Sequence, residues 1–186
     1  QQTGIGDKVF VGPEAEFFIF DDVRFSTAPY NCGFRLDSSE LPANTGTEYE
    51  MGNLGHRPRT EGGYFPVPPI DSAQDIRSEI HDGVHGCGHG EASPRGRSFT
   101  SLASSSVRSP APADAMQIYK YVIHNVVAQS YRKTATFMPK PVFGDNGSGM
   151  HVHQSIWKGS DPVFAGNLYA DLSARRLCYA PPLSHP

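Results

Sequence analysis

The chain has 186 residues, with 16 Lys and Arg against 19 Asp and Glu, a formal net charge of −3 and a pI of about 6.2. This balance argues against a nucleic-acid-binding protein, which would carry a basic surface. A hydrophobic content of 38% is enough for a buried core. No apolar run approaches the roughly 18 residues that a membrane-spanning helix needs, so a membrane protein is not expected.

The cysteines and the first residues give an expectation about the compartment. Cys32, Cys87 and Cys178 lie far apart, and residues 1–8 show no signal-peptide pattern. An odd number of widely spaced cysteines favours reduced thiols over a disulfide framework, so a cytoplasmic protein is expected.

The first part of the chain predicts strands, a loop and then a helix. Residues 9–11 and 14–20 (EAEFFIF) have the composition of strands, and the polar, Gly-containing run 44–59 predicts a loop. After two prolines, either Asp71 or Ser72 is suited to be the N-cap of a helix that has acidic residues in its first turns.

Residues 81–112 have a different composition from the sequence on either side. Gly, Ser and Pro fill 15 of these 32 positions, and neither a strand period nor a helix period is visible. The segment is therefore predicted to be a linker or disordered.

The second part of the chain contains the clearest helix pattern. In residues 114–131, Ile118, Val122 and Val126 recur at helical spacing, and Asp114 with Gln117 resembles a capping box. A short β-prone run at 134–138 and a Gly-rich turn follow. The alternation in 150–157 (MHVHQSIW) then predicts a strand.

Two acidic residues form the first candidate site. Side chains two apart on a strand point the same way, so Glu14 and Glu16 share one face of the run 14–20. Two carboxylates so close repel each other, and a partly buried pair needs a cation, such as Mg²⁺, to stay ionised. The alternative is a solvated strand end without a ligand.

The run 140–155 (KPVFGDNGSGMHVHQS) forms the second candidate site. The period of a strand places His151, His153 and Ser155 on one face, after a turn whose glycines allow close backbone approach to a ligand. Imidazoles bind metals or donate hydrogen bonds to phosphate oxygens. Histidines with an ordinary structural role are the alternative.

A third reading is a small metal-binding module. His81, His85, Cys87 and His89 offer four ligands, but the glycines between them predict no secondary structure to hold the ligands in place. It is the least favoured of the three.

Four runs of sequence carry a resemblance to a known family. Residues 12–21, 55–79, 117–126 and 133–158 closely resemble bacterial type I glutamine synthetase, and 140–155 matches that family's ATP-region signature. The resemblance implies an α+β fold, part of the catalytic domain, with an antiparallel sheet and helices on its outer side. It covers residues 4–79 and 113–173.

The resemblance also implies an activity and its requirements. Members of the family ligate ammonia to the side-chain carboxylate of glutamate, with ATP as substrate and γ-glutamyl phosphate as intermediate. They use Mg²⁺ or Mn²⁺ at two sites and assemble as cytoplasmic homododecamers. Nucleic acid and membranes are not expected partners.

Metal ligands are carried over by position from the family motifs. Glu16 matches a ligand of the first metal, beside glutamate and ammonia. Glu14 and His151 match ligands of the second metal, beside the ATP phosphates. These three are the expected catalytic residues.

Substrate contacts are carried over in the same way. Asn146 and Gly147 match the turn that contacts glutamate. His153 matches a phosphate contact and Ser155 a nucleotide contact, both to ATP. Tyr64 lies in the loop that approaches the neighbouring subunit's site.

Residues 81–112 and 174–186 depart from the family. The chain is therefore expected to consist of a first part of the catalytic domain (1–80), an unmatched segment (81–112), a continuation of the catalytic domain (113–173) and an unmatched tail (174–186). The family has a strand with three histidines and a metal-binding glutamate where 81–112 stands. With one choice of synonymous codons for 91–97, reading one nucleotide later yields Lys-His-His-His-Glu-Val-Ala, close to that motif. An internal fragment with frame-shifted segments, inactive alone, is therefore expected. The alternative is a non-catalytic fragment that binds ATP weakly or associates with intact subunits.

Overall fold

The computed structural model describes residues 4–38, 59–62, 66–86, 92–95, 101–104, 107–108, 111–168 and 171–174. The elements, in chain order, are β1 (Lys8–Ala15), β2 (Phe18–Phe20), β3 (Asp22–Ala28), β4 (Asn31–Asp37), α1 (Gln74–Gly86), β5 (Ala92–Arg95), β6 (Ser101–Ser104), β7 (Val107–Arg108), α2 (Ala111–Gln129), β8 (Thr134–Thr136), β9 (Met150–Lys158) and β10 (Asp161–Pro162). The predicted α+β class with antiparallel sheets is confirmed.

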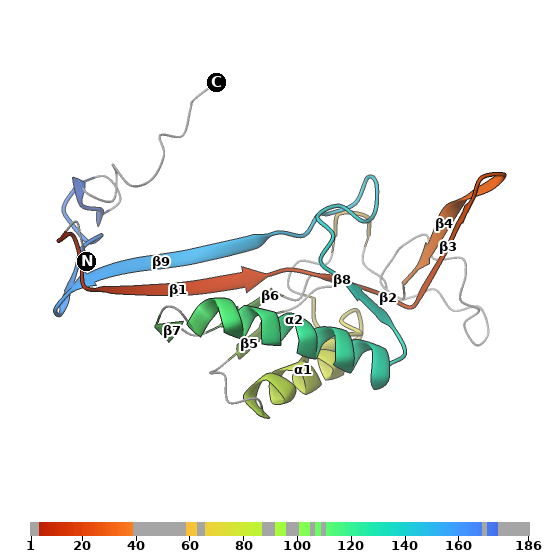
Figure 1. Cartoon of the computed structure of the whole chain (residues 1–186), viewed down its shortest axis with the longest axis horizontal. Helices are drawn as coiled ribbons and strands as arrows, with labels where there is room; N and C mark the ends of the chain where they lie inside the picture. The colour runs from red at the N-terminus through yellow and green to blue at the C-terminus, as the bar shows by residue number, and fades with distance from the viewer. Residues whose placement is uncertain are drawn as a thin grey trace, which may run out of the picture.

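The main sheet is built around β1. Its strand order is β10-β9-β1-β6-β5, with β7 also paired to β1, and every pairing is antiparallel. β9 accompanies β1 along its whole length, from Lys8 opposite Trp157 to Ala15 opposite Met150 (Figure 1). The predicted strand at 150–157 is confirmed.

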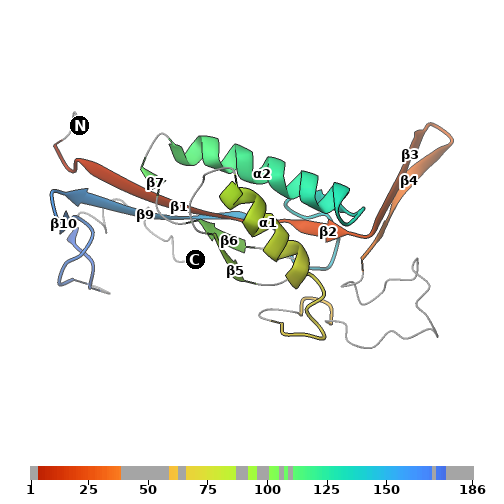
Figure 2. The same cartoon turned by 90° about the horizontal axis from the view of Figure 1, so that it is seen from below.

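Helices α1 and α2 cover one side of the β1–β9 pair (Figure 1, Figure 2). Alternate side chains from the end of β1 onward, Ala15, Phe17 and Ile19, pack into the same core as the helices. The buried helix residues of that core are Ile76, Ile80 and Val84 of α1 and Tyr119, Val122, Ile123 and Val127 of α2. Of the predicted apolar stripe, Val122 is buried and Ile118 and Val126 pack partly buried against this core, so the stripe is confirmed. Glu14, next to Ala15 on β1, lies on the opposite face of the strand.

The predicted strand 14–20 is interrupted in the structure. β1 ends at Ala15, and β2 begins at Phe18 and pairs with β8 instead of β9. Glu16 still donates its N–H to the Gly149 carbonyl (2.9 Å), after which the chain exchanges one partner strand for another. Pairing partners far away in sequence therefore decide where the strand stops.

Helix α2 begins earlier than its sequence pattern indicates. It starts at Ala111, so Asp114 lies in the first turn and the predicted capping box with Gln117 is wrong. An acidic side chain in the first turn still interacts favourably with the helix dipole.

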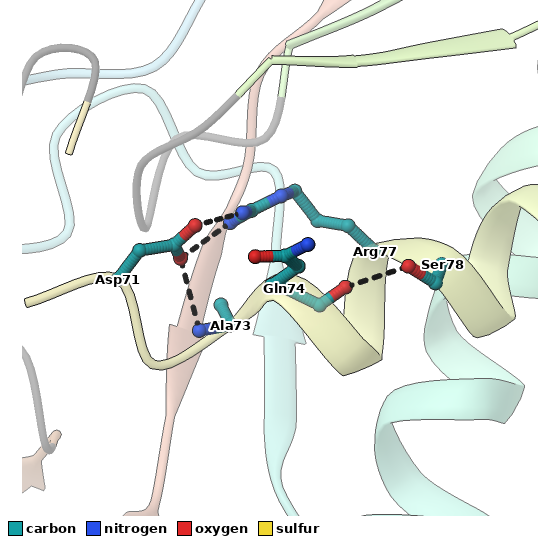
Figure 3. A network of polar contacts seen from close by, with 5 residues as sticks. All are labelled: Asp71, Ala73, Gln74, Arg77 and Ser78. Atoms are coloured by element: carbon teal, nitrogen blue, oxygen red, sulfur yellow. Dashed lines mark hydrogen bonds and ion pairs between the residues drawn. The ribbon is translucent and has the colours of Figure 1, made fainter. Parts of the chain in front are cut away.

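A buried ion pair joins the segment before helix α1 to the first turn of that helix (Figure 3). The two terminal nitrogens of the Arg77 guanidinium bind the two oxygens of the Asp71 carboxylate, and each side chain is only 5% exposed. The Asp71 carboxylate also accepts a hydrogen bond from the Ala73 N–H at 3.2 Å. The helix begins at Gln74, and its first backbone bond runs from the Arg77 N–H to the Ala73 carbonyl, so Ala73 is the N-cap and the prediction of Asp71 or Ser72 is wrong. Asp71 instead binds the backbone N–H of Ala73, just before the helix.

Regular structure occurs inside 81–112, where the sequence predicts none. Helix α1 continues to Gly86, and β5, β6 and β7 lie within the segment. β6 and β7 pair with the edge of β1 that β9 leaves open. A strand edge offers unpaired backbone groups whatever the side-chain pattern of its partner, which is why periodicity does not reveal these strands.

Strands β3 and β4 form a separate hairpin that projects beyond β2 (Figure 1, Figure 2). Phe25 and Phe34 face each other across it and are 76% and 75% exposed. Cys32, also on this hairpin, is a free, exposed thiol. Among the helices of the described ranges, none combines the length and the hydropathy needed to cross a membrane.

Candidate active site

Two acids of the first strand region meet two histidines of β9. The Nε2 atom of His153 lies 2.8 Å from Glu14 Oε1, and that of His151 lies 3.6 Å from Glu16 Oε1. The register places Glu14 directly opposite His151, so these contacts run diagonally between the strands. The four side chains therefore form one polar cluster on the face opposite the helices.

Burial differs between the two kinds of side chain in this cluster. The side chains of Glu14 and Glu16 are 26% and 22% exposed, whereas those of His151 and His153 are each 73% exposed. The carboxylates thus form the floor of the cluster, and the imidazoles stand at its rim with one edge in water.

Glu16 is held by the turn that precedes β9. Its Oε2 atom accepts a hydrogen bond from the Gly149 N–H at 3.0 Å, and its own N–H donates to the Gly149 carbonyl at 2.9 Å. One carboxylate oxygen is thereby fixed by backbone. The other is turned toward His151.

The turn that carries Asn146 and Gly147 is fixed by backbone contacts. Ser148 donates its N–H to Pro139 O and its hydroxyl to Met138 O, both at 2.8 Å. A Cβ atom at Gly147 would lie 2.8 Å from Pro139 O, so this position accepts glycine alone without a shift of backbone. Asn146 and Gly147 are half-buried, one short segment away from the residue that binds Glu16.

The remaining predicted substrate contacts lie farther along the strand or outside the structure. Ser155 is opposite Phe10, and its hydroxyl accepts a hydrogen bond from Trp157 Nε1 at 3.1 Å. Within the described part of the chain, no hydrogen bond or ion pair joins Ser155 to the acid–histidine cluster. Tyr64 lies outside the described residues.

The donor types of the cluster suit a divalent metal. Carboxylate oxygen is the ligand that Mg²⁺ and Mn²⁺ prefer, and imidazole nitrogen is a ligand of divalent transition metals. Glu14 with His153 and Glu16 with His151 each provide one such pair. Within the ranges that the structure covers, no group of three or more His, Cys, Asp or Glu side chains is close enough to hold one ion.

The alternative metal-binding module cannot be assessed, because the structure describes the side chain of one of its four proposed ligands. Only His81 has a described side chain, and its Nδ1 atom contacts Asp82 at 3.4 Å. The side chains of His85, Cys87 and His89 are not described, so that module stays a hypothesis.

Two residues near the cluster are not among the site residues that the sequence predicts. Gly149 acts through its backbone, which no side-chain pattern reveals, and Asp145 joins two turns far apart in sequence. The only signal for Asp145 is an acidic residue in a Gly-rich run, where aspartate commonly binds nearby backbone N–H groups.

Comparison with known proteins gives one consistent result. The family model described as glutamine synthetase, catalytic domain, matches residues 1–180. The glutamine synthetase of Bradyrhizobium diazoefficiens is 64% identical over 189 residues, which cover 96% of this chain and 39% of the relative. That of Escherichia coli is 49% identical over 193 residues, which cover 96% and 39%.

A solved structure agrees with these relatives. The glutamine synthetase of Plasmodium falciparum superposes with a TM-score of 0.79 at 30% identity, over 92% of this chain and 35% of that one. The family match is one continuous range that includes 81–112, where the motifs alone show no resemblance. The chain spans 39% of the length of the curated relatives named above. It belongs to the glutamine synthetase family and corresponds to part of its catalytic domain.

Proposed function

We propose that the chain is part of a glutamate–ammonia ligase that forms glutamine with consumption of ATP. In this reaction the side-chain carboxylate of glutamate is phosphorylated to γ-glutamyl phosphate, and ammonia then displaces the phosphate. The observation that supports the proposal most is the cluster of two acids and two histidines on adjacent strands. The family match is independent support. We also infer a cytoplasmic location and assembly with further copies.

Glu16 would bind one divalent cation, and Glu14 with His151 a second. Glu14 and His151 are directly opposite in the register. Because the His151 imidazole contacts Glu16 and Glu14 contacts His153, the second cation would require the His151 ring to turn toward Glu14. Bound Mg²⁺ or Mn²⁺ would stabilise the negative charge of the phosphoryl group and of the acyl intermediate. The half-buried carboxylates provide the charge that attracts such cations.

The other residues would bind the substrates. Asn146 and Gly147, on a turn held by Ser148, would contact glutamate. His153, with three quarters of its side chain exposed, can donate a hydrogen bond to a phosphate oxygen of ATP. Ser155 would contact the nucleotide farther along β9.

The chain by itself is expected to be inactive. Each acid–histidine pair supplies two donors, and the described residues contain no third ligand for either pair. Purified chain should therefore give no γ-glutamyl hydroxamate above the blank. Turnover that disappears in Glu16→Ala would show that this expectation is wrong.

A second candidate role, association with intact subunits, is favoured by the projecting hairpin. Its cross-strand pair Phe25 and Phe34 is largely exposed, and an isolated two-stranded hairpin is only marginally stable in water. We expect the chain to co-elute with an intact synthetase on size-exclusion chromatography after co-expression. Phe25→Ser with Phe34→Ser should abolish co-elution, whereas Tyr121→Ser, on the exposed side of α2, should not. Separate elution of the unsubstituted chain would remove this candidate.

A further inference from the structure

Asp145 joins two turns that are distant in the sequence. Its Oδ1 atom accepts hydrogen bonds from the Asn146 N–H at 2.9 Å and from the Glu61 N–H at 3.0 Å. Its carbonyl oxygen accepts a hydrogen bond from Lys140 Nζ. One half-buried residue is thus bound at both its side chain and its backbone.

The partner turn, residues 59–62, is tight and conformationally unusual. Gly62 donates its N–H to Arg59 O at 2.7 Å, and Glu61 has a φ of 54°, a region that residues other than glycine seldom adopt. Such a conformation persists where the surroundings enforce it. The Asp145 carboxylate, which receives the Glu61 N–H, is one such contact, and hydrogen bonds to a charged acceptor are the stronger kind.

The same carboxylate orients the residues proposed to contact glutamate. The bond from the Asn146 N–H fixes the peptide plane between Asp145 and Asn146, and Gly147 follows directly. The far side of the turn is held at Pro139 and at Glu16. Asp145 therefore fixes the start of the 144–149 turn, whose end is fixed by the backbone groups of Ser148 and Gly149.

We propose that Asp145 is a positioning residue, which holds the 59–62 turn against the 144–149 turn and so presents Asn146 and Gly147 to an L-α-amino acid. This inference rests on the proposed function, because that function assigns the glutamate contact to Asn146 and Gly147. Asp145 itself does not contact the substrate. It acts through the backbone of its neighbours.

The first part of the test measures the link between the turns. In ¹⁵N-labelled full-length chain, the Glu61 amide of Asp145→Ala should exchange with solvent about tenfold faster than in the unsubstituted chain. Asp145→Asn keeps an Oδ1 acceptor and should restore most of the protection. Asp161→Ala, an exposed acid on β10, should change nothing. Unchanged exchange at Glu61 in Asp145→Ala would overturn the link.

The Ser148 amide reports whether the variant still folds, because it bonds to Pro139 independently of Asp145. Retained protection at Ser148 with loss at Glu61 supports the proposal. If Asp145→Ala loses protection at both the Glu61 and the Ser148 amides, the Asp145→Asn variant decides. Protection of the Glu61 amide in Asp145→Asn supports the link between the turns. Loss of protection at Glu61 in Asp145→Asn, with Ser148 still protected, overturns the link.

The second part measures the ligand. L-Glutamate titrated into the unsubstituted chain should shift the Gly147 amide resonance, and Asp145→Ala should weaken the apparent affinity about tenfold or more, with rescue in Asp145→Asn. Equal affinity for L-glutamate in the unsubstituted chain and in Asp145→Ala would overturn the positioning role. Absence of any shift in the unsubstituted chain would instead count against the proposed glutamate contact, and the exchange result would still decide the link.

Discussion

At the scale of single residues, burial determines what a charged contact contributes. The Asp71–Arg77 and Asp22–Arg24 pairs have similar chemistry, but the side chains of the first are 5% exposed and those of the second are 46% and 77% exposed. A buried charge left without its partner cannot recover hydration, whereas an exposed one can. The two pairs therefore provide a matched comparison within one chain.

We expect Arg77→Ala to lower the free energy of unfolding by about 3–5 kcal/mol, because it leaves the Asp71 carboxylate buried and unpaired. Arg24→Ala should cost less than about 1 kcal/mol. Urea unfolding followed by circular dichroism measures both. Similar losses in the two variants would contradict the structure.

Tyr119 gives a second prediction at this scale. Its hydroxyl is buried without a hydrogen-bond partner in the described structure, and burial raises its pKa well above 10.0. Removing an unsatisfied polar group recovers its desolvation cost, so Tyr119→Phe should be stabilising by about 1 kcal/mol at pH 7.

The raised pKa of Tyr119 also predicts a pH dependence. The folded state keeps the proton while the unfolded state loses it near pH 10, so the folded state binds more protons and stability falls as pH rises above about 10. Urea unfolding at pH 7 and near pH 11 should show a smaller fall in Tyr119→Phe than in the unsubstituted chain. Tyr121→Phe, at an exposed position, is the control and should leave the fall unchanged.

At the scale of elements, periodicity predicts whether a segment is a helix or a strand, but the residue at which a strand ends depends on the strand with which it pairs. The stripe of α2 and the alternation of β9 are visible in the sequence, and both elements form, although α2 begins three residues before its predicted start. The break after Ala15 is not visible, because it arises from the exchange of β9 for β8 as partner. β6 and β7 are likewise explained by the free edge of β1 rather than by their own composition.

The helix–sheet interface is expected to supply most of the stability of these elements. Ile123 is fully buried between α2 and the rest of the core, so Ile123→Ala should cost about 2–5 kcal/mol in the free energy of unfolding. Tyr121→Ala removes a larger but 69% exposed side chain two positions away and should cost much less. A loss in Tyr121→Ala equal to that in Ile123→Ala would show that α2 does not pack as described.

At the scale of the whole molecule, the chain matches only part of the length of its relatives. It matches 39% of the length of its curated relatives, and its acid–histidine pairs each lack further ligands among the described residues. Catalytic sites with two divalent cations need more donors than two pairs provide. Under the proposed function, the remaining metal ligands would come from outside the described residues, and this chain would carry one portion of the site.

The unusual composition of 81–112 leads to a prediction about the gene. We expect codons 91–97 of the coding DNA, read one nucleotide later, to give a sequence close to Lys-His-His-His-Glu-Val-Ala. Two compensating insertions or deletions would then flank the segment. Sequencing the coding DNA measures this directly, and codons that give no such motif in the shifted frame would end the hypothesis.

The sequence by itself determined the family, the α+β class and the two polar runs of the candidate site. Those features depend on residue identity and local periodicity, which adjacent residues encode. Only the tertiary structure decided which acid meets which histidine, because the register of β1 against β9 is a long-range property. It also decided that Glu16 is held by the Gly149 backbone and that Asp145 reaches Glu61, 84 residues away. The donors of these bonds are the backbone N–H groups of Gly149 and Glu61, and they leave no trace in the side-chain pattern, since every residue except proline carries the same backbone donor.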